Sequence, residues 1–310
     1  MAIDIKGSVK QALESIGYYR SRLESDPFPG VAVLTYHAVR ADDLPVGTMR
    51  FEELHVTAAR LDDHCRVLRD LGCSVVSLAD WGAIARGERP APPRAVMVTF
   101  DDGYRSVLRY GLPVLERWSI PATVFVCTNP IDRQVRFWFD ALAEREGEAT
   151  VASVKAGEHD DWIRAAADEM PVDPDDPHAP LTIDELRCLS QHRLITIGAH
   201  TVSHPLLLRA PVRVQADEIG RARTTLEAWL GAPAASFAYP GGQPGVDYDA
   251  ETVNLVSRSG FEFGFTTVER FGRPSDGLLE YPRFTMLQGI SGAELAHRLA
   301  VSWPRTGVVN

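Results

Sequence analysis

The chain has 310 residues, 45% of them hydrophobic, so it can bury a large core, and a single α/β barrel domain would account for its length. Its 42 acidic and 32 basic residues give a formal net charge of -10, which argues against a nucleic-acid-binding surface and against general attraction to anionic lipid. Four cysteines without C-x-x-C spacing argue against a disulfide framework, and the absence of an 18-residue apolar stretch argues against a membrane span.

Residues 1–27 are predicted to form an amphipathic helix ahead of the main domain. Over residues 7–25, apolar side chains recur at helical spacing: Val9, Leu13, Ile16, Tyr19 and Leu23. We expect this helix to pack on the main domain, and peripheral contact with a membrane surface is the alternative. The N-terminus lacks the unbroken apolar stretch of a signal peptide, so the sequence predicts a cytoplasmic protein.

Strand-like and helical runs alternate through residues 28–310, which we interpret as one domain. Strands are predicted at 31–37, 73–78, 95–100, 122–128, 194–200, 235–240, 261–267 and 281–286. Apolar residues at three-and-four spacing predict helices at 51–71, 106–118, 213–230, 249–259 and 291–301. Seven or eight βα units predict a mainly parallel sheet that closes into a (β/α) barrel.

A segment from about 130 to 190 interrupts this alternation. It contains the runs FWFDALAEREGE and MPVDPDDPHAP and an acidic tract, and it is too long and too polar for a simple connection. We interpret it as a helical insertion beside the site. Its closure over a substrate, as a lid, is a hypothesis.

Ionisable side chains cluster where the predicted strands end, the edge that carries the site in a parallel barrel. His200 and His204 follow one such strand at a spacing of four. A single helical turn would place both imidazoles on one face, as in sites for a divalent ion such as Zn²⁺. The alternative is a pair of histidines without a metal, because this spacing alone lacks a third ligand.

The adjacent acids Asp101 and Asp102, at the end of another strand, can supply that third ligand. A single acid here would be better explained as the cap of the following helix in an Asp-Gly turn. Neighbouring side chains project in different directions, so one carboxylate can hold the metal while the other faces the substrate as a base. Two histidines and one carboxylate leave positions open for water, which predicts hydrolysis of an amide or ester.

The motifs TFDDG (99–103) and HTVSH (200–204) resemble the paired signatures of the NodB-homology polysaccharide deacetylases, the family 4 carbohydrate esterases. The resemblance covers roughly residues 30–290 and implies a distorted (β/α)7 barrel. It implies Asp101 as general base and three metal ligands: Asp102, His200 and His204. The implied reaction removes an N-acetyl group from an amino sugar of a glycan or glycan precursor by attack of metal-bound water. The oxyanion would be held by the metal and a backbone N–H among Tyr239, Pro240 and Gly241.

The chain departs from the family pattern at two positions. Ala238 stands where the third motif usually carries an arginine that orients the base, and we hypothesise that Arg283 replaces it. The usual C-terminal catalytic histidine is missing. The poly-N-acetylglucosamine deacetylase branch, which this chain resembles in its A-Y-P motif and its YH pair, points to His37. We expect His37 to protonate the departing amine, and a hydrogen-bonded histidine without a catalytic role is the alternative.

Trp138 and Asp140 are candidates for a sugar subsite, because an aromatic face and a carboxylate suit stacking and hydroxyl recognition; core packing of the insertion is the alternative. The leading interpretation is a metal-dependent N-deacetylase of an N-acetylated sugar or polysaccharide precursor, with Zn²⁺ the expected divalent metal. A deformylase or an esterase of a small or lipid-linked molecule would use the same site. A third possibility is a catalytically weakened barrel that only binds glycan.

Overall fold

The computed structural model describes residues 5–15, 17–156, 170–173, 175–273 and 276–302. Its main sheet has eight parallel strands: β1 (Val31–Tyr36), β4 (Ser74–Val75), β5 (Ala95–Phe100), β6 (Ala122–Val126), β7 (Ile195–Ala199), β8 (Ser236–Ala238), β9 (Phe263–Phe265) and β10 (Phe284–Thr285). The order along the sheet is β10-β1-β5-β6-β7-β8-β9, and β4 pairs with β5 off this path. Each predicted strand is present, although β4 and β10 are shortened to two residues.

The two ends of this sheet are joined by hydrogen bonds beside β9 and β10. The backbone N–H of Tyr281 donates to the Gly264 carbonyl at 2.8 Å, and the N–H of Thr266 donates to the Tyr281 carbonyl at 2.9 Å. Phe265 and Tyr281 thereby form a parallel bridge. The curled parallel sheet with its outer helices confirms the predicted distorted barrel.

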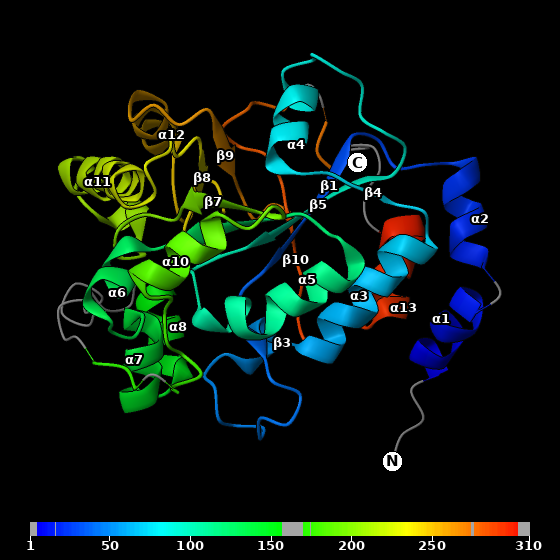
Figure 1. Ribbon diagram of the computed structural model, residues 1–310, viewed down its shortest axis with the longest axis horizontal. Coiled ribbons are helices and arrows are strands. Elements are labelled where there is room, and N and C mark those ends of the chain that lie inside the picture. The colour runs from blue at the N-terminus through cyan, green and yellow to red at the C-terminus, as the bar shows by residue number, and fades with distance from the viewer. Residues whose placement is uncertain (1–4, 16, 157–169, 174, 274–275, 303–310) are drawn as a thin grey trace.

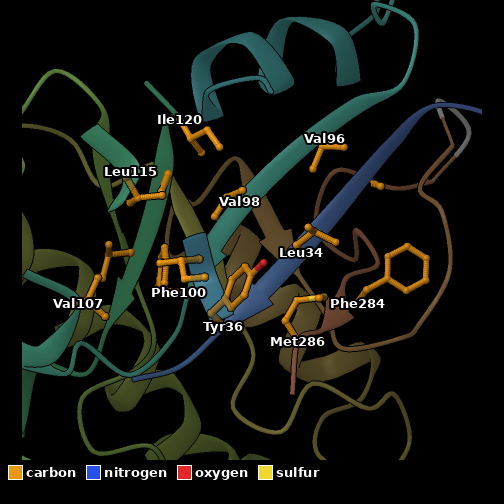
Figure 2. Close-up of a cluster of buried hydrophobic side chains, with 14 of the residues drawn as sticks. Leu34, Tyr36, Val96, Val98, Phe100, Val107, Leu115, Ile120, Phe284 and Met286 are labelled. Carbon is orange, nitrogen blue, oxygen red and sulfur yellow. The ribbon is translucent and has the colours of Figure 1, made fainter. Parts of the chain in front are cut away.

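Successive side chains of a strand point to opposite faces, and in β1 and β5 both faces are buried. Leu34 and Val98, at even positions, join the outer hydrophobic cluster, part of which Figure 2 shows. Val33 and Met97, at odd positions, join a separate inner cluster. Burial of both faces explains the nearly continuous apolar runs of the sequence. The same alternation makes Asp101, directly after β5, an inward-facing position.

Helices surround the sheet (Figure 1). They are α3 (Ala58–Asp70), α4 (Leu78–Ala85), α5 (Leu112–Trp118), α10 (Ile183–Ser190), α11 (Val212–Leu230), α12 (Ala250–Arg258) and α13 (Gly292–His297). Short helical turns lie at η1 (Glu52–Leu54), η2 (Val107–Gly111), η3 (Leu207–Arg209) and η4 (Arg298–Ser302). A small parallel pair, β2 (Val39–Arg40) and β3 (Val56–Thr57), precedes α3.

The N-terminal segment forms two helices, α1 (Ile5–Ser15) and α2 (Tyr18–Ser25), where the sequence predicts one over 7–25. Gly17 separates them with a left-handed φ of 71°, a conformation that interrupts helical hydrogen bonding and suits glycine. Tyr19 is buried, and its hydroxyl lies 3.2 Å from Nδ1 of His297 on α13. The two helices therefore pack on the barrel domain, as the sequence predicts.

The predicted insertion begins with α6 (Thr128–Arg133), α7 (Trp138–Glu146) and α8 (Glu148–Ala156). Residues 157–169 and 174 of the insertion lie outside the described residues. The first turn of α7 joins a hydrophobic cluster with Tyr104 and Phe137. The described part is helical up to Ala156, as predicted, and residues 170–173 and 175–182 are turns and irregular structure. Closure over a substrate stays a prediction.

His64 is a buried histidine that should make the stability of the protein depend on pH. Its Nδ1 lies 3.1 Å from the Tyr36 hydroxyl and its Nε2 lies 2.7 Å from the Ile290 carbonyl oxygen. Burial lowers the pKa of His64 from 6.5 to about 4. Below pH 6.5 the unfolded chain therefore gains a proton that the folded chain does not take up until about pH 4. Stability should fall through this window by up to about 3 kcal/mol.

We expect His64→Gln to flatten part of this pH dependence, because the amide can keep both hydrogen bonds without titrating. The measurement is the free energy of urea unfolding of both proteins at several pH values from 7.5 to 4. Curves for the two proteins that run parallel through the whole window would contradict the assignment to His64.

Candidate active site and metal centre

Asp101 lies directly after β5 and faces the barrel interior, where it meets Arg283. The two guanidinium nitrogens Nη1 and Nη2 donate to Oδ1 and Oδ2 of Asp101, each at 2.7 Å. Nε of Arg283 donates to the Thr266 carbonyl at 2.9 Å, and Nη1 also reaches the hydroxyls of Thr35 and Thr99. Arg283 has no exposed surface. This bidentate pair fixes the position and orientation of the Asp101 carboxylate.

Burial on its own would raise the pKa of Asp101, but the charges of Arg283 and His200 and the hydrogen bonds from Arg283 outweigh it and hold the pKa at about 2. Asp101 is therefore ionised throughout the neutral range. A carboxylate in this state can accept a proton, which is the property that a general base requires.

Asp102, His200 and His204 form a buried cluster whose nearest ligand atoms all lie within 4.8 Å of one another. Nε2 of His200 is 3.5 Å and Nε2 of His204 is 3.6 Å from Oδ1 of Asp102. Asp102 has a left-handed φ of 73° and so leaves the line of β5. Two adjacent carboxylates thus point to different partners, as the sequence predicts.

The loop after β7 brings the histidines together differently from the prediction. No helical turn connects them, because Thr201 and His204 both adopt left-handed φ values, 70° and 58°. The predicted helical turn is therefore wrong, although both imidazoles still face Asp102. The left-handed residues turn the chain back within four positions. A right-handed turn would also reverse the chain, but it would point the side chains in different directions.

The chemistry of the three side chains fits a divalent metal ion. Nδ1 of His200 lies 2.7 Å from the Ala238 carbonyl oxygen, so it carries the proton and leaves the Nε2 lone pair facing the cluster. Burial lowers the pKa of His200, and burial followed by the charge of His200 lowers that of His204, which favours the neutral, ligating form. Oδ1 of Asp102 is buried and has no hydrogen-bond partner among the described residues.

The raised pKa of Asp102 also favours a bound metal ion. Burial, then the charges of Asp101 and Asp140, raise the pKa of Asp102 well above 3.8. A buried carboxylate without a compensating charge is costly, and a divalent cation between it and the two imidazoles would remove that cost. The cluster is thus a candidate metal site of the two-histidine, one-carboxylate type.

His37 follows β1 at the next inward position and is partly buried. Its Nδ1 is buried and has no hydrogen-bond partner in the described part of the chain. Burial lowers the pKa of His37 to about 4, while the charge of Asp101 opposes this and the charge of His200 adds to it. His37 therefore shares the electrostatic environment of the Asp101 pair, and it is neutral at pH 7.

The segment after β8 contains the three residues predicted to hold an oxyanion. The N–H of Tyr239 donates to the Phe265 carbonyl at 3.1 Å, and proline has no N–H, so neither Tyr239 nor Pro240 offers a free backbone donor. Of the three residues predicted to hold the oxyanion, only Gly241 therefore remains a candidate donor through its backbone N–H. Gly241 has a φ of 69°, and a Cβ there would lie 2.4 Å from the Asp247 carboxylate, so only glycine fits.

Trp138 and Asp140 do not form the predicted sugar subsite. Asp140 has no exposed surface and accepts a 2.6 Å hydrogen bond from the Tyr104 hydroxyl. Trp138 keeps only 4% of its surface exposed, and its indole N–H donates to the His204 carbonyl at 2.8 Å. Both side chains therefore belong to the buried interior of the insertion, where Trp138 packs in one hydrophobic cluster with Tyr104 and Phe137.

Glu218 of α11 is a site residue that the sequence analysis missed. Its carboxylate accepts hydrogen bonds from the backbone N–H groups of Val202 and Ser203 and from the Ser203 hydroxyl. No motif marks it, because it lies fourteen positions beyond His204 within an ordinary amphipathic helix. Only the packing of α11 beside the loop brings it to the site.

A curled parallel sheet that gathers carboxylates and histidines at the carboxyl ends of its strands is typical of a barrel-type enzyme. The resemblance seen in the motifs agrees with a direct comparison. The chain belongs to the polysaccharide deacetylase family, whose family model matches residues 88–264.

Individual relatives agree with this assignment. The chain is 34% identical over 143 residues to poly-beta-1,6-N-acetyl-D-glucosamine N-deacetylase of Escherichia coli O157:H7, a match that covers 44% of this chain and 20% of that protein. The chain thus spans about a fifth of the length of that relative.

Solved structures share the fold. The Streptococcus pyogenes deacetylase PplD in complex with acetate has a TM-score of 0.65 at 21% identity, with 88% of this chain and 99% of that chain covered. IcaB from Ammonifex degensii also has a TM-score of 0.65, at 22% identity, with 88% and 98% covered. No helix among the described residues has both the length and the apolar character needed to cross a membrane.

Proposed function

We propose that the protein is a metal-dependent hydrolase that removes N-acetyl groups from an amino-sugar glycan. The observation that carries this proposal is the buried cluster of Asp102, His200 and His204 beside Asp101, which Arg283 holds ionised. Membership in the polysaccharide deacetylase family supports an acetyl group as the acyl group and a polysaccharide as the substrate. A β-1,6-linked N-acetylglucosamine polymer is the first substrate to test, because the Escherichia coli relative is named for it.

Each residue has a defined task in this proposal. Asp102, His200 and His204 would hold a divalent ion, with zinc the expected metal for two imidazoles and one carboxylate. When bound, the ion would act as a Lewis acid and lower the pKa of the water molecule that attacks the acyl carbon. Asp101 takes the proton of that water, and Arg283 orients Asp101. The N–H of Gly241 is the candidate donor to the developing oxyanion.

His37 is proposed to pass a proton to the departing amine. Because its pKa is about 4, the imidazole is neutral at pH 7 and donates only after it has received a proton, for which Asp101 is the nearby source. We expect His37→Ala to lower turnover about 100-fold while zinc stays bound, a loss typical of a missing general acid. Turnover and zinc content of the purified variant test this; near-normal turnover would remove His37 from the reaction.

The experiment that tests the function is product release from a panel of substrates. The panel contains N-acetylated amino-sugar oligomers, N-formylated analogues and O-acetyl esters, each incubated with the protein with and without a chelator. We expect acetate from the N-acetylated oligomers, loss of release with chelator, and no release by Asp101→Asn. Formate release or ester cleavage alone would instead identify a deformylase or an esterase, and stoichiometric zinc without any release would identify a binding protein.

A further inference from the structure

We propose that Trp138 and Glu218 are positioning residues that hold the loop carrying both histidines, and thereby set the affinity of the site for its metal. The inference rests on the proposed function, because it concerns the same site. It makes part of the 130–190 insertion a component of the metal centre.

The loop needs such support because its own conformation is unfavourable. Between β7 and η3 no regular structure holds residues 200–206. Thr201 and His204 have left-handed φ values of 70° and 58°, which cost free energy in residues other than glycine. Within the loop, the N–H of His204 donates to the Thr201 hydroxyl at 3.0 Å. Contacts from other elements must therefore stabilise the arrangement in which both imidazoles face Asp102.

Trp138 supplies one such contact from α7. Its indole N–H donates to the carbonyl of His204 at 2.8 Å, and the side chain is almost fully buried. The adjacent Phe139 ring packs edge-on against the imidazole of His204, with 4.9 Å between ring centroids. The indole thus fixes the backbone of the second histidine, while Phe139 limits rotation of its ring. Partners of this kind around metal ligands control metal affinity.

Glu218 supplies the second contact from α11. One carboxylate oxygen accepts the N–H groups of Val202 at 3.0 Å and of Ser203 at 2.8 Å, and the other accepts the Ser203 hydroxyl at 2.8 Å. These three bonds hold the residues between the two histidines. Since hydrogen bonds to a charged acceptor are the stronger kind, Glu218 fixes the spacing of the histidines from outside the loop.

The chain offers a matched control for each residue. Trp81 is a fully buried tryptophan of the inner cluster, and its indole N–H has no hydrogen-bond partner among the described residues. Trp81→Phe therefore makes the same substitution in the core without removing a contact to the histidine loop. Glu227 lies on the same helix as Glu218. Its carboxylate likewise accepts hydrogen bonds, from the backbone N–H of Ala234 and from Nε of Arg223. Glu227→Ala therefore removes a comparable contact without touching residues 200–204.

The experiment measures the zinc affinity of the metal-stripped 310-residue chain by competition with a chromogenic chelator. We expect Trp138→Phe and Glu218→Ala each to weaken zinc binding about 10-fold or more, the usual effect of losing a partner of a metal ligand. Glu218→Gln should lose less zinc affinity, because its amide oxygen can still accept hydrogen bonds from the two backbone N–H groups. Trp81→Phe and Glu227→Ala should leave the affinity unchanged.

Amide hydrogen exchange of residues 201–204 in the metal-stripped proteins is the second readout. We expect faster exchange in Trp138→Phe and Glu218→Ala than in the wild type and in both controls. Wild-type zinc affinity and wild-type exchange in these two variants would overturn the proposal. A folded wild-type chain that binds no zinc would overturn both this proposal and the proposed function. Weakened zinc binding in the variants, with no acetate release by the wild type, would overturn the deacetylase assignment alone.

Discussion

Arg283→Met is expected to move the acid limb of the pH–rate profile upward by at least about one pH unit, and to destabilise the folded protein by about 3–5 kcal/mol. Arg283 is fully buried and neutralises Asp101 through two 2.7 Å hydrogen bonds. Without the guanidinium, the remaining interactions no longer outweigh the effect of burial, which raises the pKa of Asp101. The base is then ionised only at higher pH. The stability that this pair contributes is present above pH 3.8 and is lost as the pH falls toward 2.

Two further variants isolate this effect. Arg283→Lys keeps the positive charge but cannot bind both carboxylate oxygens in the same plane, so we expect an intermediate shift. Arg270→Met removes a partly exposed arginine paired with Asp276 and should cost no more than about 1 kcal/mol without moving the profile. The measurements are kcat/KM as a function of pH and the free energy of unfolding. A profile that Arg283→Met barely alters would contradict the role of Arg283.

Asp102→Asn is expected to weaken zinc binding strongly and, at the same time, to stabilise the metal-free protein. Oδ1 of Asp102 is buried without a hydrogen-bond partner among the described residues, and burial with two neighbouring carboxylates raises its pKa. Replacing this uncompensated acid by a neutral amide should raise the free energy of unfolding of the metal-free form by about 1–3 kcal/mol. Asparagine also tolerates the left-handed φ of 73° at this position.

The same change removes a ligand, so zinc affinity should fall by more than about 100-fold, beyond the effect of losing an outer partner. Urea unfolding in the presence of chelator gives the first quantity, and zinc competition gives the second. Asp247→Asn is the control, because burial also raises the pKa of Asp247 but its carboxylate accepts the Gln243 N–H and lies outside the cluster. A less stable metal-free Asp102→Asn, or one that keeps zinc, would contradict the metal site.

The sequence was sufficient to predict the barrel and the residues at its strand ends. Adjacent side chains project in different directions, so the sequence predicted that one acid holds a metal and the other acts as a base. The resemblance to the deacetylase family then implied Asp101 as the base and Asp102 as the ligand. The pairing of Arg283 with Asp101 was predicted because an arginine was missing from position 238 and one was available at the last strand. The clustering of these residues follows from local pattern and strand order, whereas their individual roles follow from the resemblance to the family motifs.

What sequence could not predict depends on backbone conformation and on packing between distant segments. The left-handed residues Thr201 and His204 replace the expected helical turn, and no residue type at these positions signals it. For Trp138 the sequence left a sugar subsite and core packing as alternatives, because an aromatic residue in a polar insertion suits either a surface or a core. Its burial behind His204 follows from how α7 docks, which is a tertiary property.

The most direct measurement is the rate of acetate release from β-1,6-linked N-acetylglucosamine oligomers while metal-stripped protein is titrated with zinc. We expect no release without zinc, a rate that rises in proportion to added zinc and a plateau at one equivalent. Asp101→Asn should bind the same equivalent and release no acetate. Undiminished release after metal stripping, or no release at any zinc concentration, would contradict a metal-dependent N-deacetylase at this site.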